Sequence, residues 1–286
     1  MKDEADEARA EVSTAFSPRL IGAERAAYQL ALRTLSAAGI PYVVGGAFAV
    51  YHYTGVWRYT RDLDVFLLPE DVGRALDVLG GAGFRTWVES ENWLAKAQWG
   101  PGHVDLIFGS GNWLAAVDRQ WLDRGVPARL LGVPVLVAPV EELIWSKAYV
   151  AGRERYDAAD VMHLLLSVRG RLDWDHLLAR FDGHSELLFS YLCLFRFVYP
   201  HDRQLIPDDV MARLVAQQRQ MLREPPPKAR VCQGTLLDRY SYNFDVEHGY
   251  QDPREELAEA RGFSRQAVIR ERRRDEQIAQ TAHDEG

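Results

Sequence analysis

One strand-like segment restricts the possible folds most strongly: it reads DLDVFLL and occupies residues 62–68. Its run of large apolar residues is typical of a strand that enters a buried sheet, and Pro69 ends the run. Residues two apart on a strand point to the same side, so Asp62 and Asp64 project together. Two carboxylates at this range repel each other unless a cation lies between them. We therefore expect an α/β sheet with a charged strand inside it.

The D-x-D spacing occurs a second time, at Asp173 and Asp175, in a different setting. In a chain this rich in aspartate, chance alone produces about two such pairs, so the spacing by itself identifies nothing. The second pair precedes a helical run at 176–181, where acids are ordinary cap or first-turn residues. The first pair lies on a strand, and its hard oxygen ligands suit Mg²⁺ or Mn²⁺. We predict the metal site at Asp62 and Asp64.

Two glycines, Gly45 and Gly46, lie between a short apolar run at 40–44 and a helical pattern over 47–53. Glycines at a strand-to-helix turn let the backbone approach a phosphate, and the helix N-terminus offers N–H donors to it. A tight turn without a ligand is the alternative for a Gly-Gly pair taken alone. Because the acid pair follows closely in the chain, we expect this turn to approach a phosphate.

A third acid, Asp105, lies within the apolar segment 103–108. A carboxylate among apolar strand residues is costly unless it is paired, hydrogen-bonded or bound to a metal. An acid that faces water from an edge strand is the alternative. Because two acids already lie on another strand, we expect Asp105 to be a third metal ligand.

The remaining pattern predicts a mixed α/β half followed by a helical half. The expected architecture is a small mixed sheet with flanking helices and a C-terminal helical domain. Periodicity and glycine stops predict helices over 20–38, 70–79, 140–151 and 157–167, and apolar runs predict strands over 40–44, 60–68, 84–88 and 103–108 with a hairpin over 128–138.

Composition divides the chain into four parts. Residues 1–18 are expected to form a charged, flexible leader, and 19–168 hold the sheet and its acids. Residues 169–223 are expected to form a helical domain. A Glu-Pro-Pro-Pro run opens the fourth part, 224–286, which combines a linker with a charged tail that is helical over about 253–280.

Charge and cysteine content exclude several classes of function. The chain carries 34 Lys+Arg against 41 Asp+Glu, a net charge of −7, which argues against extended DNA or RNA binding. Its cysteines, Cys193 and Cys232, have no metal-ligand spacing and predict no disulfide framework. No apolar stretch reaches the length of a membrane span, and the acidic start lacks the apolar core of a signal peptide. We expect a cytoplasmic protein.

Taken together, these motifs resemble the polymerase-β-type nucleotidyltransferase superfamily. The resemblance is carried by the glycine pair, by the string R-x-T-x-D-L-D-V over residues 58–65, and by Asp105. A helical string over 139–160 is similar to one in minimal bacterial members, among them AbiEii-type toxins and the lincosamide and aminoglycoside nucleotidyltransferases. The likeness covers about residues 25–168, whereas 170–286 resemble nothing to which we can assign a function.

The resemblance implies metal-dependent transfer of a nucleoside monophosphate from an NTP such as ATP to an acceptor hydroxyl, with release of pyrophosphate. Asp62 and Asp64 would hold two Mg²⁺ or Mn²⁺ ions. Asp105 would bind the ion that activates the hydroxyl, or take the hydroxyl proton. The triphosphate would lie over the glycine pair, with Lys147 and Arg58 neutralising its charge. The smallest members have Gly-Ser where this chain has Gly-Gly, so a serine hydroxyl on the phosphate is missing.

Several alternatives stay open on the sequence. The acceptor is an RNA end, a protein side chain or a small molecule, and neither the base of the NTP nor the oligomeric state is fixed. A rival interpretation is a catalytically inactive nucleotide- or partner-binding member of the fold, such as one half of a toxin–antitoxin pair. A hydrolase that uses the same carboxylates to transfer to water is a third.

Overall fold

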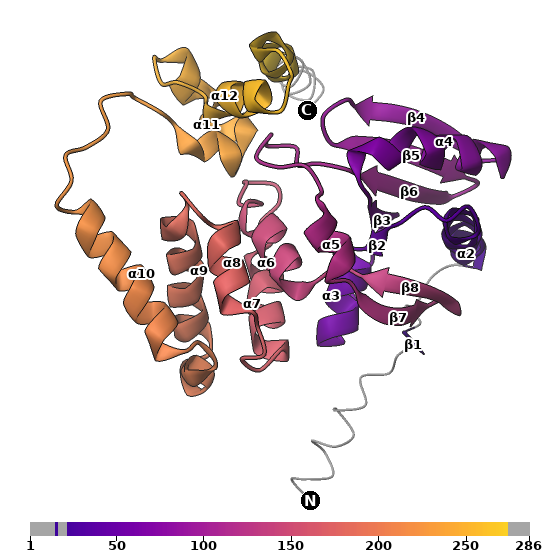
Figure 1. Cartoon of the computed structure of the whole chain (residues 1–286), viewed down its shortest axis with the longest axis horizontal. Helices are drawn as coiled ribbons and strands as arrows, with labels where there is room; N and C mark the ends of the chain where they lie inside the picture. The colour runs from indigo at the N-terminus through magenta and orange to yellow at the C-terminus, as the bar shows by residue number, and fades with distance from the viewer. Residues whose placement is uncertain (1–14, 17–21, 274–286) are drawn as a thin grey trace, which may run out of the picture. The chain divides into compact units, whose positions relative to one another are not determined.

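The computed structural model describes residues 15–16 and 22–273. The predicted leader, apart from 15–16, and the end of the predicted tail helix therefore lie outside the described residues. Within the described part, the expected fold class is confirmed: a mixed α/β sheet is followed by helices (Figure 1).

The chain forms two compact units. The sheet unit runs to Ser110 and continues through Ala115–Leu143, and the helical unit combines Gly111–Leu114 with the chain from Ile144 onward. The predicted divisions after residues 168 and 223 stay predictions.

An eight-stranded sheet forms the centre of the sheet unit, with the order β1-β7-β8-β2-β3-β6-β5-β4. Its middle strands, β2, β3 and β6, carry the predicted turn and acids. β3 pairs antiparallel with β2 and parallel with β6, and β5 pairs antiparallel with β6. The strands are β1 (Ala15–Phe16), β2 (Val43–Val44), β3 (Asp62–Phe66), β4 (Arg85–Ser90), β5 (Leu94–Trp99), β6 (Gly102–Ile107), β7 (Val126–Leu130) and β8 (Val133–Val137).

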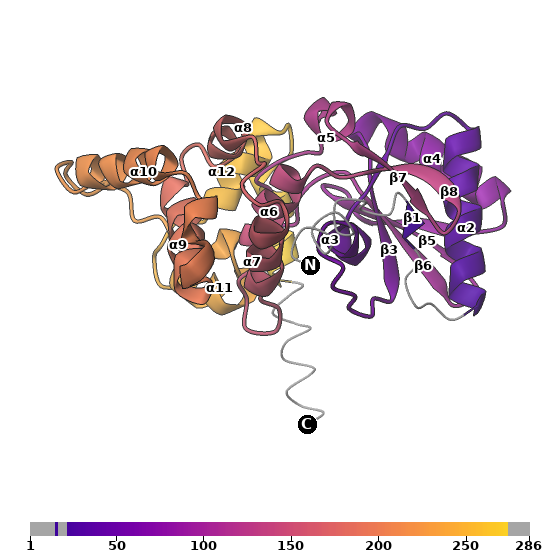
Figure 2. The same cartoon turned by 90° about the horizontal axis from the view of Figure 1, so that it is seen from below.

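Helices α2 (Gly22–Ala37) and α4 (Val72–Gly81) cover one face of this sheet (Figure 2). Burial alternates along β6, where Val104 and Leu106 are buried and their neighbours are half-buried. Gly102 shares the buried face, and a Cβ there would overlap the Cβ of Ala27 on α2. The apolar face therefore packs on α2, and the alternate residues point to the opposite face.

Most elements predicted for this unit are confirmed, and one strand was missed. The helices at 20–38 and 70–79, the hairpin at 128–138 and the strand at 84–88 appear with ends shifted by a few residues. The missed strand is β5, whose sequence LAKAQW lacks β-branched residues and is rich in residues that favour helices. Two short helices complete the unit, α3 (Gly46–Thr54) and α5 (Arg119–Asp123).

In its described residues, the helical unit consists of helices, short 3₁₀ turns, isolated bridges and the loops between them. The predicted tail helix over 253–280 is wrong in one respect, because a break at Gly262, with a φ of 82°, separates α12 from the helix at 265–273. Among the described residues, no helix is both long and apolar enough to cross a bilayer. The named helices are α6 (Val140–Ala148), α7 (Ala158–Ser167), α8 (Trp174–Arg180), α9 (Ser185–Val198), α10 (Asp208–Met221), α11 (Arg239–Glu247) and α12 (Pro253–Ala260).

Candidate functional site

The three predicted carboxylates lie on neighbouring parallel strands and on one face of the sheet. Asp64 of β3 is directly opposite Asp105 of β6, and Asp62 is opposite His103. Directly paired residues share a face, and the half-buried positions of both strands alternate with buried apolar ones. The carboxylates therefore lie on the face that α2 and α4 leave uncovered.

The glycine turn lies against one of these carboxylates. The Gly45 amide donates to the Asp64 carbonyl at 3.0 Å, and Gly45 caps the start of α3. Gly46 has a φ of +53°, and a Cβ there would overlap Asp64 Oδ2. A Cβ on Gly45 would overlap the Phe66 ring. Both glycines are therefore required, because they bring the positive end of the α3 dipole against the Asp64 carboxylate.

A lysine that the sequence reasoning missed completes the carboxylate cluster. Lys96 of β5 is directly opposite Asp105, and its Nζ lies 2.8 Å from Asp105 Oδ1. Burial raises the pKa of Asp105 above its ordinary value, and the nearby Asp62 charge adds to this, although Lys96 opposes both. Burial favours the neutral amine of Lys96, but the hydrogen bond to Asp105 and the charges of the nearby acids together outweigh it and raise the pKa of Lys96.

These residues form one row across four strands and the glycine turn. From the sheet edge inward, Trp87, Lys96, Asp105 and Asp64 are successive cross-strand partners, and the Gly45 amide hydrogen-bonds to Asp64 at the far end. Cross-strand neighbours on one face are close enough for their side chains to interact. The row therefore joins an aromatic ring, a cation, two acids and the helix start in one strip.

A second row runs beside the first and is also polar. It joins Arg85, Gln98, His103 and Asp62 as cross-strand partners. Gln98 Nε2 lies 3.5 Å from His103 Nε2. The open face of β3, β5 and β6 is thus lined by groups that bind charged or hydrogen-bonding ligands.

Stacked aromatic rings close one end of this face. Phe66, two residues beyond Asp64 on β3, stacks on Trp121 of α5 with ring centroids 4.6 Å apart and an angle of 12° between planes. Trp121 is buried, so this pair is packing that bounds the site.

Arg58 lies in the loop between α3 and β3, with an exposed side chain. Its two chain neighbours hold the loop in place. The Trp57 ring packs edge-on against Phe48 and Tyr51, and the Tyr59 hydroxyl donates to Glu24 Oε1 at 2.9 Å. Arg58 is therefore carried by a loop that is tied down on both sides.

Lys147 lies in the helical unit, within a buried ion cluster. Its Nζ donates to Asp157 Oδ2 at 2.7 Å and to Asp160 Oδ2 at 2.8 Å, and Arg155 also binds Asp157. Burial alone would raise the pKa of Asp157, but Arg155 and Lys147 outweigh it and hold that pKa below its ordinary value. These contacts give Lys147 a clear structural role.

The donor chemistry of the acid pair fits a divalent metal ion. Asp62 and Asp64 present hard carboxylate oxygens on one face, which suit Mg²⁺ or Mn²⁺. Within the described part of the chain, however, no three His, Cys, Asp or Glu side chains are arranged to hold a metal ion together. One oxygen of the third acid, Asp105, is instead bound by Lys96.

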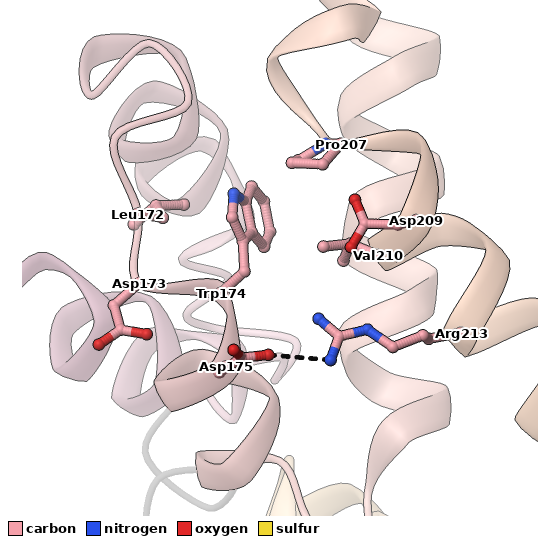
Figure 3. A pocket seen from close by; sticks show the side chains of 8 residues that line it. All are labelled: Leu172, Asp173, Trp174, Asp175, Pro207, Asp209, Val210 and Arg213. Carbon is pink, nitrogen blue, oxygen red and sulfur yellow. Dashed lines mark hydrogen bonds and ion pairs between the residues drawn. The ribbon is translucent and has the colours of Figure 1, made fainter.

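The second D-x-D has the cap role that its sequence context predicts. Asp173 accepts from the His176 amide at 3.0 Å at the start of α8, and Asp175 pairs with Arg213 of α10 at 2.9 Å. Both border a shallow pocket of about 500 Å³ in the helical unit, whose walls include Trp174 (Figure 3). The structure thus confirms that the two D-x-D pairs differ.

Comparisons with known proteins find likeness at the level of structure. No family model matches the chain, and no curated protein matches it by sequence. A solution structure of the antibiotic-resistance factor ANT(2″)-Ia matches with 15% identity and a TM-score of 0.40, covering 70% of this chain and 97% of that one. The lincosamide antibiotic adenylyltransferase LnuA matches with 14% identity and a TM-score of 0.37, covering 51% and 98%. JHP933 from Helicobacter pylori matches with 13% identity and a TM-score of 0.36, covering 79% and 96%.

Proposed function

We propose that this protein transfers a nucleoside monophosphate from an NTP to an acceptor hydroxyl, with release of pyrophosphate, in a reaction that depends on a divalent metal. One observation carries the proposal: Asp62, Asp64 and Asp105 share the open sheet face, and the start of α3 lies against Asp64. Anions are attracted to a helix N-terminus, whereas carboxylates repel them. Triphosphate and carboxylates can share this place only when a cation lies between them.

In this proposal the start of α3 and the two carboxylates of β3 have separate tasks. The first amides of α3 bind phosphate oxygens, and Gly45 and Gly46 keep the backbone free of side chains that would block the approach. Asp62 and Asp64 hold the divalent ion, Mg²⁺ or Mn²⁺, which when bound offsets the charge that develops on the phosphates. Arg58 extends from the anchored loop and adds positive charge for the triphosphate.

Asp105 is the group that we assign to the acceptor. The oxygen that Lys96 does not bind accepts the proton of the attacking hydroxyl, while the new bond forms at the α-phosphorus and the bond to pyrophosphate breaks. The raised pKa of Asp105 suits a group that must take up a proton during the reaction.

Thermal unfolding with each of the four NTPs, with and without Mg²⁺, tests the proposal. A ligand at about 100 times its dissociation constant adds roughly 2.7 kcal/mol of stability. We expect a metal-dependent shift with one or two NTPs in the wild type and none in Asp64→Asn. Asp175→Asn is the matched control, because it changes an acid of the same spacing outside the site.

The nucleotides that shift the melting temperature then serve as labelled donors in a screen of small molecules, RNA ends and proteins. Transfer to water alone would identify a hydrolase. No shift with any NTP, from well-folded protein, would refute the transferase and favour a partner-binding member of the fold.

A further inference from the structure

The position of Lys96 is fixed by the sheet itself. On β5, Lys96 and Gln98 alternate with the buried residues Ala95 and Ala97. This alternation places Lys96 on the carboxylate face, and the β5–β6 register sets it directly opposite Asp105. Its ammonium group is therefore placed at the carboxylates by backbone pairing on a strand that has partners on both sides, rather than by a flexible loop.

Lys96 and Asp105 are partly shielded from solvent. The side chains of Lys96 and Asp105 are 25% and 14% exposed, and their contact is 2.8 Å long. Charges that are partly buried interact more strongly than charges on an open surface. Two more acids act on the same ammonium group, Asp62 from β3 and Glu89 from β4. Lys96 therefore balances charge for the whole cluster as well as for its direct partner.

A divalent ion and this ammonium group need the same carboxylate. A metal ion held by all three acids requires an oxygen from each of them, yet no such group of three exists among the described residues. Lys96 binds an oxygen of Asp105, and we assign the metal to the other two acids, Asp62 and Asp64, which share a face of β3. We propose that Lys96 is a positioning residue that neutralises Asp105 in place of a second divalent ion. The site would then bind one divalent ion before nucleotide arrives. This inference rests on the proposed function.

Binding of Mn²⁺ without nucleotide, followed by electron paramagnetic resonance, tests this inference in the full chain. The wild type should bind one Mn²⁺ ion in the site. In Lys96→Met, which keeps the length of the side chain and removes its charge, Asp105 is released. We expect a second bound ion, or affinity higher by about tenfold, because a positive charge has left the cluster. Lys96→Arg keeps the charge and should behave as the wild type.

Two controls separate this effect from a general loss of charge or fold. Lys228→Met removes an exposed lysine and should leave Mn²⁺ binding unchanged. Asp105→Asn combined with Lys96→Met should abolish the gain. Lys96→Gln provides a second neutral variant if Lys96→Met unfolds, and circular dichroism verifies the fold of each.

The outcomes distinguish this inference from the proposed function. Equal Mn²⁺ binding by the wild type and the folded neutral variants would overturn the role of Lys96 and leave the metal site intact. Binding by the neutral variants alone would show that Lys96 opposes metal binding, but it would overturn the inference that the wild type binds one ion before nucleotide. No binding by any of them would overturn this inference, while the proposed function would still be decided by the Mg²⁺-dependent shift with NTP.

Discussion

Two clusters of lysine and aspartate, one in each unit, have the same chemistry but different surroundings. In the sheet unit, Lys96 and Asp105 lie on the sheet face opposite α2 and α4, partly exposed, beside further acids. In the helical unit, Lys147 lies between Asp157 and Asp160, with all three side chains at most 10% exposed. A buried cluster whose charges are satisfied stabilises the fold, whereas a cluster that stays open to solvent can bind a ligand. The setting of the lysine, more than its identity, separates a structural role from a functional one.

The largest effect should come from the open cluster. Asp64→Asn should reduce nucleotidyl transfer by about a thousandfold, because it removes a carboxylate that would hold the divalent ion. The stability of the fold should change little, since Asp64 is half-buried. Steady-state rates with labelled NTP measure the loss, and Asp175→Asn should retain wild-type rates. Equal losses in both variants would contradict the assignment.

Substitution of the lysine in the buried cluster should change the stability of the fold. Lys147→Met leaves two buried carboxylates without their shared partner and should lower the free energy of unfolding by about 3 kcal/mol. Denaturant unfolding gives the value. Arg213→Met, which breaks an exposed ion pair in the same unit, should lower it by less than about 1 kcal/mol. If both substitutions cost the same, burial is not what distinguishes the two lysines.

The glycine turn offers a test of close packing at the open cluster. Gly46→Ala should lower the free energy of unfolding by about 2 kcal/mol, because the new Cβ meets Asp64 Oδ2 and the φ is positive. Gly132→Ala is the matched control: its φ is also positive, but nothing lies near its Cβ position. Only Gly46→Ala should also abolish the NTP-dependent rise in melting temperature. If Gly46→Ala lowers the free energy of unfolding no more than Gly132→Ala does, the Asp64 side chain moves aside without a loss of stability.

The smallest effect is a pH dependence of stability. The pKa of Asp157 is lower in the folded protein than in the unfolded chain. Ionised Asp157 therefore stabilises the fold in full above its unfolded pKa of about 3.9, and this stabilisation is lost as the pH falls through the lowered pKa. The destabilisation by Asp157→Asn should therefore shrink in acid, as measured by urea unfolding at pH 7 and pH 3. The raised pKa of Asp105 acts in the opposite direction, because folding then favours proton uptake. A cost of Asp157→Asn that does not vary with pH would contradict this.

Much of the site could be predicted from the sequence, because its parts have strong local signals. The acids of β3 and β6 lie in apolar runs, and the glycine pair lies at a strand-to-helix turn, so the shared face followed from strand periodicity. That these groups bind metal and nucleotide stays a prediction.

Lys96 was missed because β5 resembles a helix in composition. Its polar residues, Lys96 and Gln98, do alternate with alanines, and this period of two was the signal available. The partner of Lys96 depends on the register between strands, which one segment of sequence does not contain. The ion cluster of Lys147 was not predicted either, because a lysine followed by two acids is equally typical of a solvent-exposed helix face.

The row from Trp87 to Gly45 has a consequence for how the protein folds. Its members come from five separate segments of the chain, so none of them meets its neighbours until the central strands have paired. Such non-local pairings form slowly, because loop-closure entropy is lost before the contacts compensate for it. A slip of β6 by one residue would place Asp105 on the α2 face and Val104 among the acids. Folding intermediates should therefore lack the ligand site entirely, and its appearance would report completion of the sheet.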